Sequence, residues 1–481
     1  MTFDHPNISA EFRNYTQVRS SHWNEQAERL LHWKSLGGAY HQRLTECYRQ
    51  IIPPGSRILE LGCGSGDLIS ALQPDHGVGV DFADSMVKLA QSRHPEITFI
   101  QADAHHLDLN DEKFDYIILS DLVNDLWDVQ QVISNVGMFC TSETRVIINY
   151  YSRIWEFPLW LASELGLTVK QLTQNWLTRE DLINLLHLSG LEVVNDFREI
   201  LLPLNLSFIS RFFNRVLVKC FPFNLFALSN LIICRKPELH QNEPRVSVII
   251  PARNEAGNIE SAITRVPEMG LGTQIIFVEG NSTDDTYERI QQAVTEHPEK
   301  NCQFYRQSGK GKADAVRLGF EHASGEILMI LDADLTVLPE DLPRFYEALR
   351  MNKGEFINGV RLVYPMEKEA MRFFNLMGNK MFSMAFSWLL GQPVKDTLCG
   401  TKVLWKNDYE RIKKGRAYFG EFDPFGDFDL LFGAARLNLR IIDLPIRYHE
   451  RTYGSTNISR WSHGWLLIKM VAFAAKRLKF I

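Results

Sequence analysis

The sequence lacks both a paired set of cysteines and a long apolar segment. Its seven cysteines are an odd number, lie scattered, and include no CxxC pair and no zinc-ligand spacing. This usage argues against a disulfide framework and favours a reducing compartment. No run approaches the roughly 18–20 apolar residues that cross a bilayer. The first six residues, MTFDHP, have neither the basic start nor the apolar core of a signal peptide. We therefore expect a cytoplasmic protein that at most lies on a membrane.

The sequence also has no excess of positive charge. The net charge is -6, so we expect no binding to nucleic acid. The 45% of hydrophobic and 23% of charged residues are typical of a folded protein, and 481 residues exceed one ordinary core. The polar segment 237–244, PELHQNEP, is bracketed by prolines. It is interpreted as a linker between domains at 1–236 and 245–481.

The first domain begins with helical sequence up to about residue 50, read as a lid or flank, and continues as strands that each end in chemistry-bearing residues. A strand at 57–61 leads into the glycines of LGCGSG and then a helix start, the first βα unit of a nucleotide-binding sheet. The spacing is GxGxG rather than GxGxxG, which argues against NAD. Strands at 77–80 and 97–101 end near Asp81 and Asp103, and a carboxylate at the first of these positions accepts hydrogen bonds from ribose hydroxyls.

This order of elements resembles the class I S-adenosylmethionine-dependent methyltransferases over roughly residues 20–236. The resemblance implies a Rossmann-like α/β domain with S-adenosylmethionine as cofactor. It further implies that Asp81 holds the ribose, that Asp103 reaches the adenine, and that four residues of the turn line the cofactor: Glu60, Gly62, Gly64 and Gly66. Methyl transfer often needs little beyond positioning, so the sequence names no catalytic residue. A catalytically silent domain that only binds S-adenosylmethionine stays the alternative.

Three further segments of this half carry expectations. The aromatic stretch 155–176 either covers a substrate or packs on the core, and the sequence leaves both open. The segment 209–226 has the pattern of an amphipathic helix, for which a core-facing position is favoured over a membrane surface. Residues 230–237 are interpreted as an edge strand.

The second half is organised around GEILMILDAD at 325–334, a short apolar run that ends in two acids. Such a run is typical of a buried strand in a parallel sheet. Residues i and i+2 of an extended chain point the same way, so Asp332 and Asp334 are predicted to share one cation. A hard divalent ion takes one or two carboxylates and fills its shell with phosphate oxygens. The pattern therefore predicts a metal–diphosphate site.

Four further motifs accompany this strand: PARNE at 251–255, VEGNSTDDT at 278–286, GKGKADAV at 309–316 and LDADLT at 331–336. Together they resemble the family 2 glycosyltransferases with the GT-A fold, and within them the dolichyl- and polyprenyl-phosphate glycosyltransferases. The likeness covers nearly all of residues 245–460. It departs from that group's pattern at Glu279, usually Asp, at Cys399, usually Ser, at Thr401–Lys402, and at Asn457, usually Lys.

The resemblance implies inverting transfer of a sugar from a nucleotide-sugar donor to a polyprenyl phosphate. Asp332 and Asp334 would hold Mg²⁺ or Mn²⁺, with Asp334 catalytic, and Asp396 would act as a base or orient the acceptor. The residues implied to bind substrate are Pro251, Asn254, Glu255, Glu279, Lys312, Asp332, Arg361, Arg372 and Arg451, the arginines through phosphate. A soluble or protein acceptor stays the alternative.

The C-terminal segment 464–479 places Trp and aliphatic residues beside basic ones, a composition typical of an interfacial helix on anionic lipid. We expect an amphipathic C-terminal helix and peripheral attachment to the cytoplasmic face of a membrane. The Phe- and Met-rich segment 371–390 favours core burial by its helical spacing. As a whole, the sequence predicts a bifunctional enzyme with two α/β domains.

Overall fold

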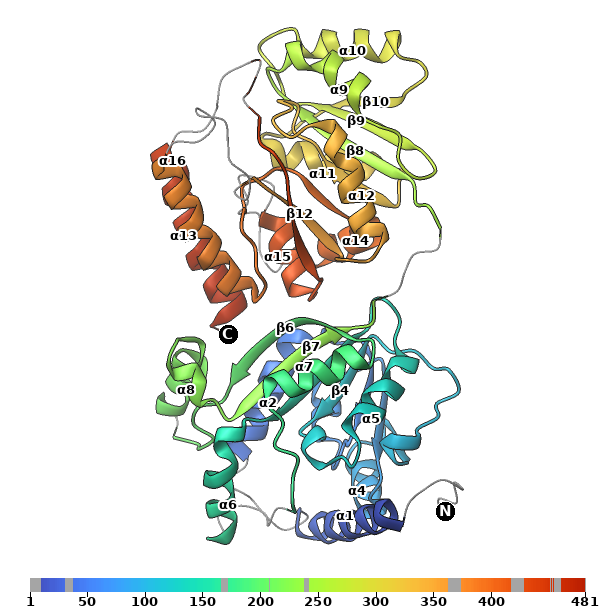
Figure 1. The fold of residues 1–481 in the computed structure, drawn as a ribbon, viewed down its shortest axis with the longest axis vertical. Coiled ribbons are helices and arrows are strands. Elements are labelled where there is room, and N and C mark those ends of the chain that lie inside the picture. The colour runs from blue at the N-terminus through green and yellow to red at the C-terminus, as the bar shows by residue number, and fades with distance from the viewer. Residues whose placement is uncertain are drawn as a thin grey trace. The chain divides into compact units, whose positions relative to one another are not determined.

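The computed structural model describes residues 10–30, 38–165, 172–206, 208–237, 242–361, 373–416, 428–449, 451, 453 and 460–480. The chain divides into two compact units, residues 1–238 and 239–479, which follow one another in the colours of Figure 1. Each unit contains one seven-stranded sheet with helices on both faces. This confirms the predicted α/β class with two domains. Residues 238–241 of the predicted linker lie outside the described residues.

The sheet of the N-terminal unit is mostly parallel. Its strands are β1 (Arg57–Leu61), β2 (His76–Asp81), β3 (Thr98–Gln101), β4 (Tyr116–Ser120), β5 (Arg145–Tyr151), β6 (Glu192–Glu199) and β7 (Ser229–Arg235), in the order β3-β2-β1-β4-β5-β7-β6. Only β7 is antiparallel to its neighbours. The predicted edge strand at 230–237 is thus wrong in its position, since β7 lies inside the sheet and β6 forms the edge. Nearly every residue of β7 is buried, as expected of a strand with a neighbouring strand on each side.

Helices cover both faces of this sheet. They are α1 (Ala10–Leu30), α2 (Gly38–Ile51), α3 (Asp67–Ala71), α4 (Asp84–Arg93), α5 (Val129–Val136), α6 (Glu156–Glu164), α7 (Arg179–Leu188) and α8 (Phe208–Arg215), with the short helices η2 (Val123–Asp125), η5 (Leu217–Lys219) and η6 (Phe223–Phe226). Apolar side chains of α5 and α7 pack on one face, and those of α2, α3 and α4 pack on the other. The prediction of helices up to about residue 50 is confirmed by α1 and α2.

The C-terminal unit contains a second mixed sheet. Its strands are β8 (Val246–Ala252), β9 (Thr273–Glu279), β10 (Asn301–Arg306), β11 (Ile327–Ile330), β12 (Phe356–Val360), β13 (Lys402–Trp405) and β14 (Ile441–Pro445), in the order β10-β9-β8-β11-β13-β12-β14. β13 is antiparallel to β11 and β12, and the other pairs are parallel. The strand order reverses between β8 and β11, which brings their carboxyl ends together as the predicted strand pattern requires.

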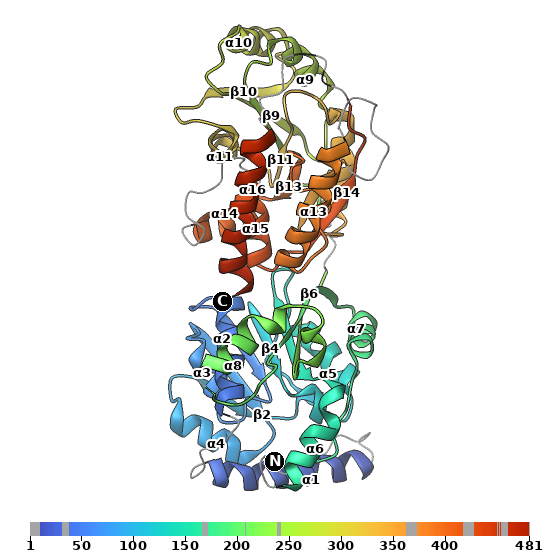
Figure 2. The ribbon, with the colours of Figure 1, turned by 90° about the vertical axis from the view of Figure 1, so that its left-hand side faces the viewer.

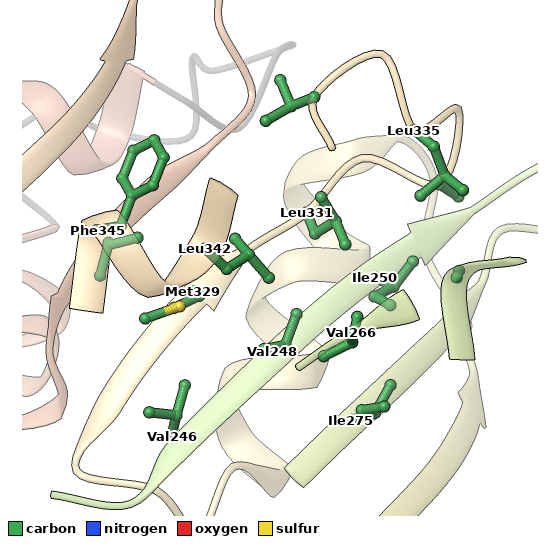
Figure 3. Close-up of a cluster of buried hydrophobic side chains, with 14 of the residues drawn as sticks. Val246, Val248, Ile250, Val266, Ile275, Met329, Leu331, Leu335, Leu342 and Phe345 are labelled. Carbon is green, nitrogen blue, oxygen red and sulfur yellow. The ribbon is translucent and has the colours of Figure 1, made fainter. Parts of the chain in front are cut away.

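The helices of this unit are α9 (Ile259–Arg265), α10 (Thr286–Glu296), α11 (Lys312–His322), α12 (Leu342–Arg350), α13 (Phe373–Leu390), α14 (Lys406–Gly415), α15 (Phe428–Arg436) and α16 (Arg460–Ala474). Figure 3 shows one core of the unit, in which Val248 and Ile250 of β8 pack against Leu342 of α12. α11, α14 and α15 cover the opposite face, and α13 and α16 lie side by side (Figure 2).

All seven cysteines are free. Among the described residues, no helix combines the length and the apolar character that a bilayer crossing requires.

Candidate active sites

A pocket of the N-terminal unit opens near the carboxyl ends of β1, β2 and β3. It encloses about 450 Å³, including space open to solvent. Its lining contains three of the six residues predicted to bind the cofactor: Gly62, Asp81 and Asp103. The strand order reverses between β1 and β4, and doubly wound sheets bind ligands at such a point.

The glycine-rich turn after β1 forms one wall of this pocket. Gly62, Gly64 and Gly66 have φ values of 71°, 51° and 74°, a region that side chains avoid. A Cβ on Gly66 would lie 2.5 Å from the Phe99 ring, so this position also needs glycine for space. Buried Glu60 accepts a hydrogen bond from the Ile69 N–H at 3.1 Å, and burial raises its pKa to about 8. Glu60, Gly64 and Gly66 thus shape the turn and are not among the residues that line the pocket.

The two aspartates of the pocket are buried and hold backbone in place. Asp81 accepts hydrogen bonds from the N–H groups of Gly64 at 3.0 Å and Ala83 at 2.9 Å, and burial raises its pKa to about 6. Asp103 Oδ1 lies 2.6 Å from Nδ1 of His105 and accepts the N–H of the same residue at 2.9 Å. Burial raises the Asp103 pKa, but the His105 bonds outweigh it and leave the pKa below its ordinary value. A nucleoside in the pocket would meet both side chains.

The sequence did not reveal the contribution of α1. Tyr15 and Arg19 of this helix line the pocket together with Asp125 of η2. The Arg19 guanidinium lies 3.5 Å from the Tyr15 ring centroid and donates to Asp125 Oδ1 at 2.7 Å. Trp23 Nε1 donates to the other Asp125 oxygen at 2.8 Å. The sequence signal was the row of aromatic and basic residues in a helix read only as a lid or flank.

A second polar cluster lies at the end of β4, with partners from β5 and α2. Asp121 has a φ of 53° and accepts hydrogen bonds from Tyr40 Oη at 2.8 Å and Asn149 Nδ2 at 2.6 Å. Tyr48 Oη donates to Asn149 Oδ1 at 2.6 Å, and Tyr151 also bonds Asp121. Burial raises the Asp121 pKa to about 7. The cluster therefore holds a carboxyl group that can change its protonation near neutral pH.

In the C-terminal unit, two carboxylates that follow β11 pair with two cations, Lys312 at the start of α11 and Arg451 after β14. Asp332 Oδ1 pairs with Lys312 Nζ at 2.6 Å, and Asp334 Oδ2 pairs with Arg451 Nη2 at 2.6 Å. A second Arg451 nitrogen lies 3.4 Å from Glu255 Oε1. Burial raises the Asp332 pKa, but Lys312 outweighs it and keeps the pKa below its ordinary value. Five residues predicted to bind donor or metal are therefore gathered in one place.

The local backbone differs from the extended chain assumed for the two aspartates. β11 ends at Ile330, and Ala333 and Asp334 form a turn. Alternation along a strand therefore does not bring the carboxylates together. The turn is held instead by Thr336, whose hydroxyl donates to Asp334 Oδ1 at 2.8 Å.

The carboxylates of this site fit a divalent metal ion that is bound together with a diphosphate. Carboxylate oxygens suit a hard divalent ion, and Asp332 and Asp334 offer two such groups. In the described part of the chain, no group of three or more His, Cys, Asp and Glu side chains is placed to hold a metal. The residues thus fit Mg²⁺ or Mn²⁺ bound together with a diphosphate, and do not form an all-protein metal cage.

Asp396 is the most constrained of the predicted site residues. Its side chain is 1% exposed, and both of its oxygens accept from the Arg361 guanidinium, at 2.7 and 2.9 Å. The Leu398 N–H also donates to it, at 3.1 Å. Burial raises the Asp396 pKa, but Arg361 outweighs this and holds the pKa below its ordinary value. The geometry favours a carboxylate that positions Arg361, whose guanidinium also lies 5.1 Å from the centre of the Tyr448 ring.

Gly400 shows why the predicted motif at 394–400 needs a glycine. A Cβ on this residue would overlap Asp332 Oδ2 and Lys312 Nζ. The backbone after Asp396 therefore touches the ion pair after β11. The two segments form one site although they are far apart in the sequence.

The other residues predicted to bind the donor lie at or just after the ends of two neighbouring strands, β8 and β9. Pro251 of β8 is paired with Val278 of β9, and buried Glu279 is the last residue of β9. Glu279 Oε1 accepts the Ser282 N–H at 2.5 Å, and Asn254 Oδ1 accepts the Thr283 N–H at 2.8 Å. These bonds fix the loop that follows β9 against the end of β8. Arg372 and Asn457 lie outside the described residues.

Each half of the chain matches a known family of transferases. Residues 52–188 match the family described as "Methyltransferase domain", and residues 247–409 match "Glycosyl transferase family 2". The chain thus carries a methyltransferase domain and a family 2 glycosyltransferase domain.

Similar proteins include a dolichol-phosphate mannosyltransferase of Pyrococcus furiosus, 29% identical over 220 residues, which are 44% of this chain and 59% of that protein. An undecaprenyl-phosphate 4-deoxy-4-formamido-L-arabinose transferase of Edwardsiella ictaluri is 31% identical over 216 residues, 44% of this chain and 62% of that protein. The chain thus spans about three fifths of each. A solved methyltransferase of Thermotoga maritima, a possible histamine N-methyltransferase, is 16% identical with a TM-score of 0.35, over 46% of this chain and 99% of that one.

Proposed function

We propose that the C-terminal domain transfers a sugar, with inversion, from a nucleotide-sugar donor to a polyprenyl phosphate. We further propose that the N-terminal domain methylates a glycan- or lipid-related substrate with S-adenosylmethionine. The observation that carries the first proposal is the pairing of Asp332 with Lys312 and of Asp334 with Arg451 at the strand ends. Two of the similar proteins are named for polyprenyl phosphates, which supports this class of acceptor.

The balanced charges of the site suit a nucleoside diphosphate. A divalent ion on Asp332 and Asp334 would stabilise negative charge that develops on the leaving diphosphate. Lys312 and Arg451 would then be released to phosphate oxygens, for which the guanidinium fork is well shaped. Pro251, Asn254, Glu255 and Glu279 would hold the nucleoside at the ends of β8 and β9.

Arg361 would meet the acceptor or the diphosphate, with Asp396 as its positioning residue. A polyprenyl phosphate is already ionised near neutral pH, so its attack needs no strong base. This agrees with a carboxylate whose two oxygens are occupied by Arg361. Arg372 is proposed as a further phosphate contact on the resemblance alone.

In the N-terminal domain, the pocket would bind S-adenosylmethionine. Asp81 would accept from the ribose hydroxyls and Asp103 would reach the adenine. Gly62 would let the cofactor approach the backbone, in a turn that Glu60, Gly64 and Gly66 shape.

Attachment to the cytoplasmic face of a membrane would occur through α13 and α16. Met381, Met384 and Trp388 of α13 are exposed, as are Trp465 and Ile468 of α16, while Phe386 and Leu389 of α13 face the core. The expectation of core burial for 371–390 thus holds for one side of α13, within its described residues. Exposed apolar and basic residues together are typical of an interfacial helix.

The test is sugar transfer from a panel of nucleotide sugars to a polyprenyl phosphate, with Mg²⁺ or Mn²⁺. Wild type is compared with Asp334→Asn and with the control Glu347→Gln, which removes an exposed carboxylate on α12, outside the site. We expect transfer that needs both the metal and Asp334 and is unchanged in the control. Donor hydrolysis without lipid product would remove the lipid acceptor and favour a soluble or protein acceptor. Absence of any donor use would refute the proposal.

The methyltransferase proposal is tested by transfer of a labelled methyl group to the lipid product. Binding of S-adenosylmethionine without transfer to any glycan or lipid would refute it and leave a silent binding domain.

A further inference from the structure

The N-terminal unit carries a set of exposed apolar side chains that do not line its pocket. On α6, Phe157 is 67% and Trp160 is 55% exposed. On α8, Phe208 is 77% exposed, and Phe221 and Phe226 nearby are 80% and 62% exposed. We call α6, α8, η6 and residue 221 the aromatic face. Monomeric soluble proteins rarely expose so many large apolar side chains together, and such patches mark interaction sites.

The elements of the aromatic face belong to one surface. Trp155 Nε1, just before α6, donates to the Phe226 carbonyl of η6 at 2.9 Å. The chain runs directly from α8 through η5 to η6, and these elements pack on one another. Figures 1 and 2 both show α6 and α8 on the same side of the N-terminal unit.

The phenylalanines of α8 point outward because the polar side of this helix is held against the domain. Asn214 is the buried residue of α8. Its carbonyl accepts the N–H groups of Leu201 and Leu202, both at 2.8 Å, and its amide donates to the Leu202 carbonyl at 2.8 Å. The phenylalanines of α8 are thereby turned to solvent. The expectation of a core-facing helix at 209–226 is therefore wrong for α8, whereas Val218 of η5 is buried.

The charge of the segment that contains α8 and η6 is of one sign. Residues 200–228 contain three basic residues and no Asp or Glu. Arg215 pairs with Glu46 and Lys219 with Glu199, while exposed Arg211 has no ion pair or hydrogen bond within the described residues. The acids of α6, Glu156 and Glu164, stand at the two ends of that helix.

We propose that the aromatic face inserts into the interfacial layer of an anionic lipid bilayer, so that the methyltransferase domain binds a membrane by itself. Large exposed apolar side chains on a helix that also carries Arg211 and Arg215 are the composition of an interfacial anchor. A methyltransferase domain bound to the membrane would find its methyl acceptor on a lipid, and this part of the inference rests on the proposed methyl transfer. The membrane contact itself rests on neither activity.

The first test is hydrogen exchange of the full-length protein with vesicles of phosphatidylcholine, alone or mixed with phosphatidylglycerol. We expect slower exchange in peptides from 153–165 and 208–226 when the anionic vesicles are present. Protection confined to α13 and α16, or no protection, would overturn the proposal while leaving sugar transfer to lipid intact. Protection that instead rises with protein concentration without vesicles would show that a second copy covers the face.

The second test uses variants in vesicle co-sedimentation. Phe208→Ser with Phe226→Ser should lower partition into anionic vesicles roughly a hundredfold, about tenfold for each phenyl group kept in water. Arg211→Gln should lower it about fivefold, and only with anionic lipid. The control pair Leu188→Ser and Met138→Ser removes exposed apolar residues of the same domain outside the aromatic face. Equal loss in the control, or none in the first pair, would overturn the proposal.

Discussion

Replacement of Asp396 by asparagine separates two roles that this carboxylate can have in sugar transfer. Asp396 acts either on the acceptor as a base or through Arg361 as its positioning partner. Both Asp396 oxygens bind the Arg361 guanidinium, and the two side chains are 1% and 12% exposed. Asparagine keeps one acceptor oxygen and the shape but removes the charge, which leaves Arg361 as an uncompensated cation in a buried position.

The magnitude follows from this burial. Two unit charges about 4 Å apart attract by about 4 kcal/mol at an effective dielectric constant near 20. Removal of one member of a buried ion pair destabilises proteins by about 3–5 kcal/mol, because the remaining charge stays desolvated. We therefore expect Asp396→Asn to destabilise the glycosyltransferase domain by about this amount, together with loss of transfer. Thermal unfolding and initial rates measure the two effects.

A double-mutant cycle with Arg361→Gln distinguishes the roles. If Asp396 acts only through Arg361, the double variant transfers sugar no more slowly than Arg361→Gln, and it is more stable than Asp396→Asn. In that case, addition of Asp396→Asn to Arg361→Gln should leave the low-pH part of the pH–rate profile unchanged, because no fall in rate at low pH reports protonation of Asp396. A further large loss of rate when Asp396→Asn is added to Arg361→Gln would refute the positioning role and restore Asp396 as a base.

Three further predictions address the other site features. Gly400→Ala should abolish use of the sugar donor with the fold retained, because its Cβ overlaps the adjacent ion pair, whereas Gly415→Ala, where a Cβ meets nothing within 4 Å, should be silent in the same assay. Asp81→Asn should weaken S-adenosylmethionine binding roughly 10- to 100-fold in calorimetry, since bonds to a charged acceptor contribute about 1.5–3 kcal/mol, and the exposed control Asp84→Asn should not. Burial raises the Glu60 pKa to about 8, so the folded domain keeps a proton that the unfolded chain releases above its pKa of 4.5. The protonated Glu60 therefore contributes to the free energy of unfolding at low pH, and this contribution is lost as pH rises toward 8. The unfolding temperature should therefore fall from pH 5 to 8 in wild type and fall less in Glu60→Gln, and an equal fall would contradict this.

The strands that carry the sites were predictable because each is a short apolar run with polar residues at its end. The predicted strand at 57–61 corresponds to β1, and the end of the run before Asp332 corresponds to β11. The position of β7 inside its sheet was not predictable in the same way. Apolar runs show that a strand is buried, but strand order depends on contacts with β5 and β6, which are distant in sequence.

The site residues were predictable as a set of strand-end positions, but their partners were not. Asp332 and Asp396 both follow the pattern of a functional carboxylate, and the sequence gives no means to tell that one is bound by a single lysine and the other enclosed by Arg361. Arg19 and Tyr15 belong to the pocket only because α1 packs against α4. Such packing is a property of the tertiary structure, and helical periodicity does not identify the partner.

The same limit explains why α8 was assigned to the core. Periodicity identifies which side of a helix is apolar, but not what covers that side, because a core and a lipid surface select the same side chains. The polar residues decide between them. Asn214 is buried and satisfied by the backbone of Leu201 and Leu202, so to turn the helix around would expose these bonds and bury Arg211. An asparagine whose amide and carbonyl are both consumed by buried backbone therefore fixes the orientation, and it leaves the apolar side of α8 for a partner outside the domain.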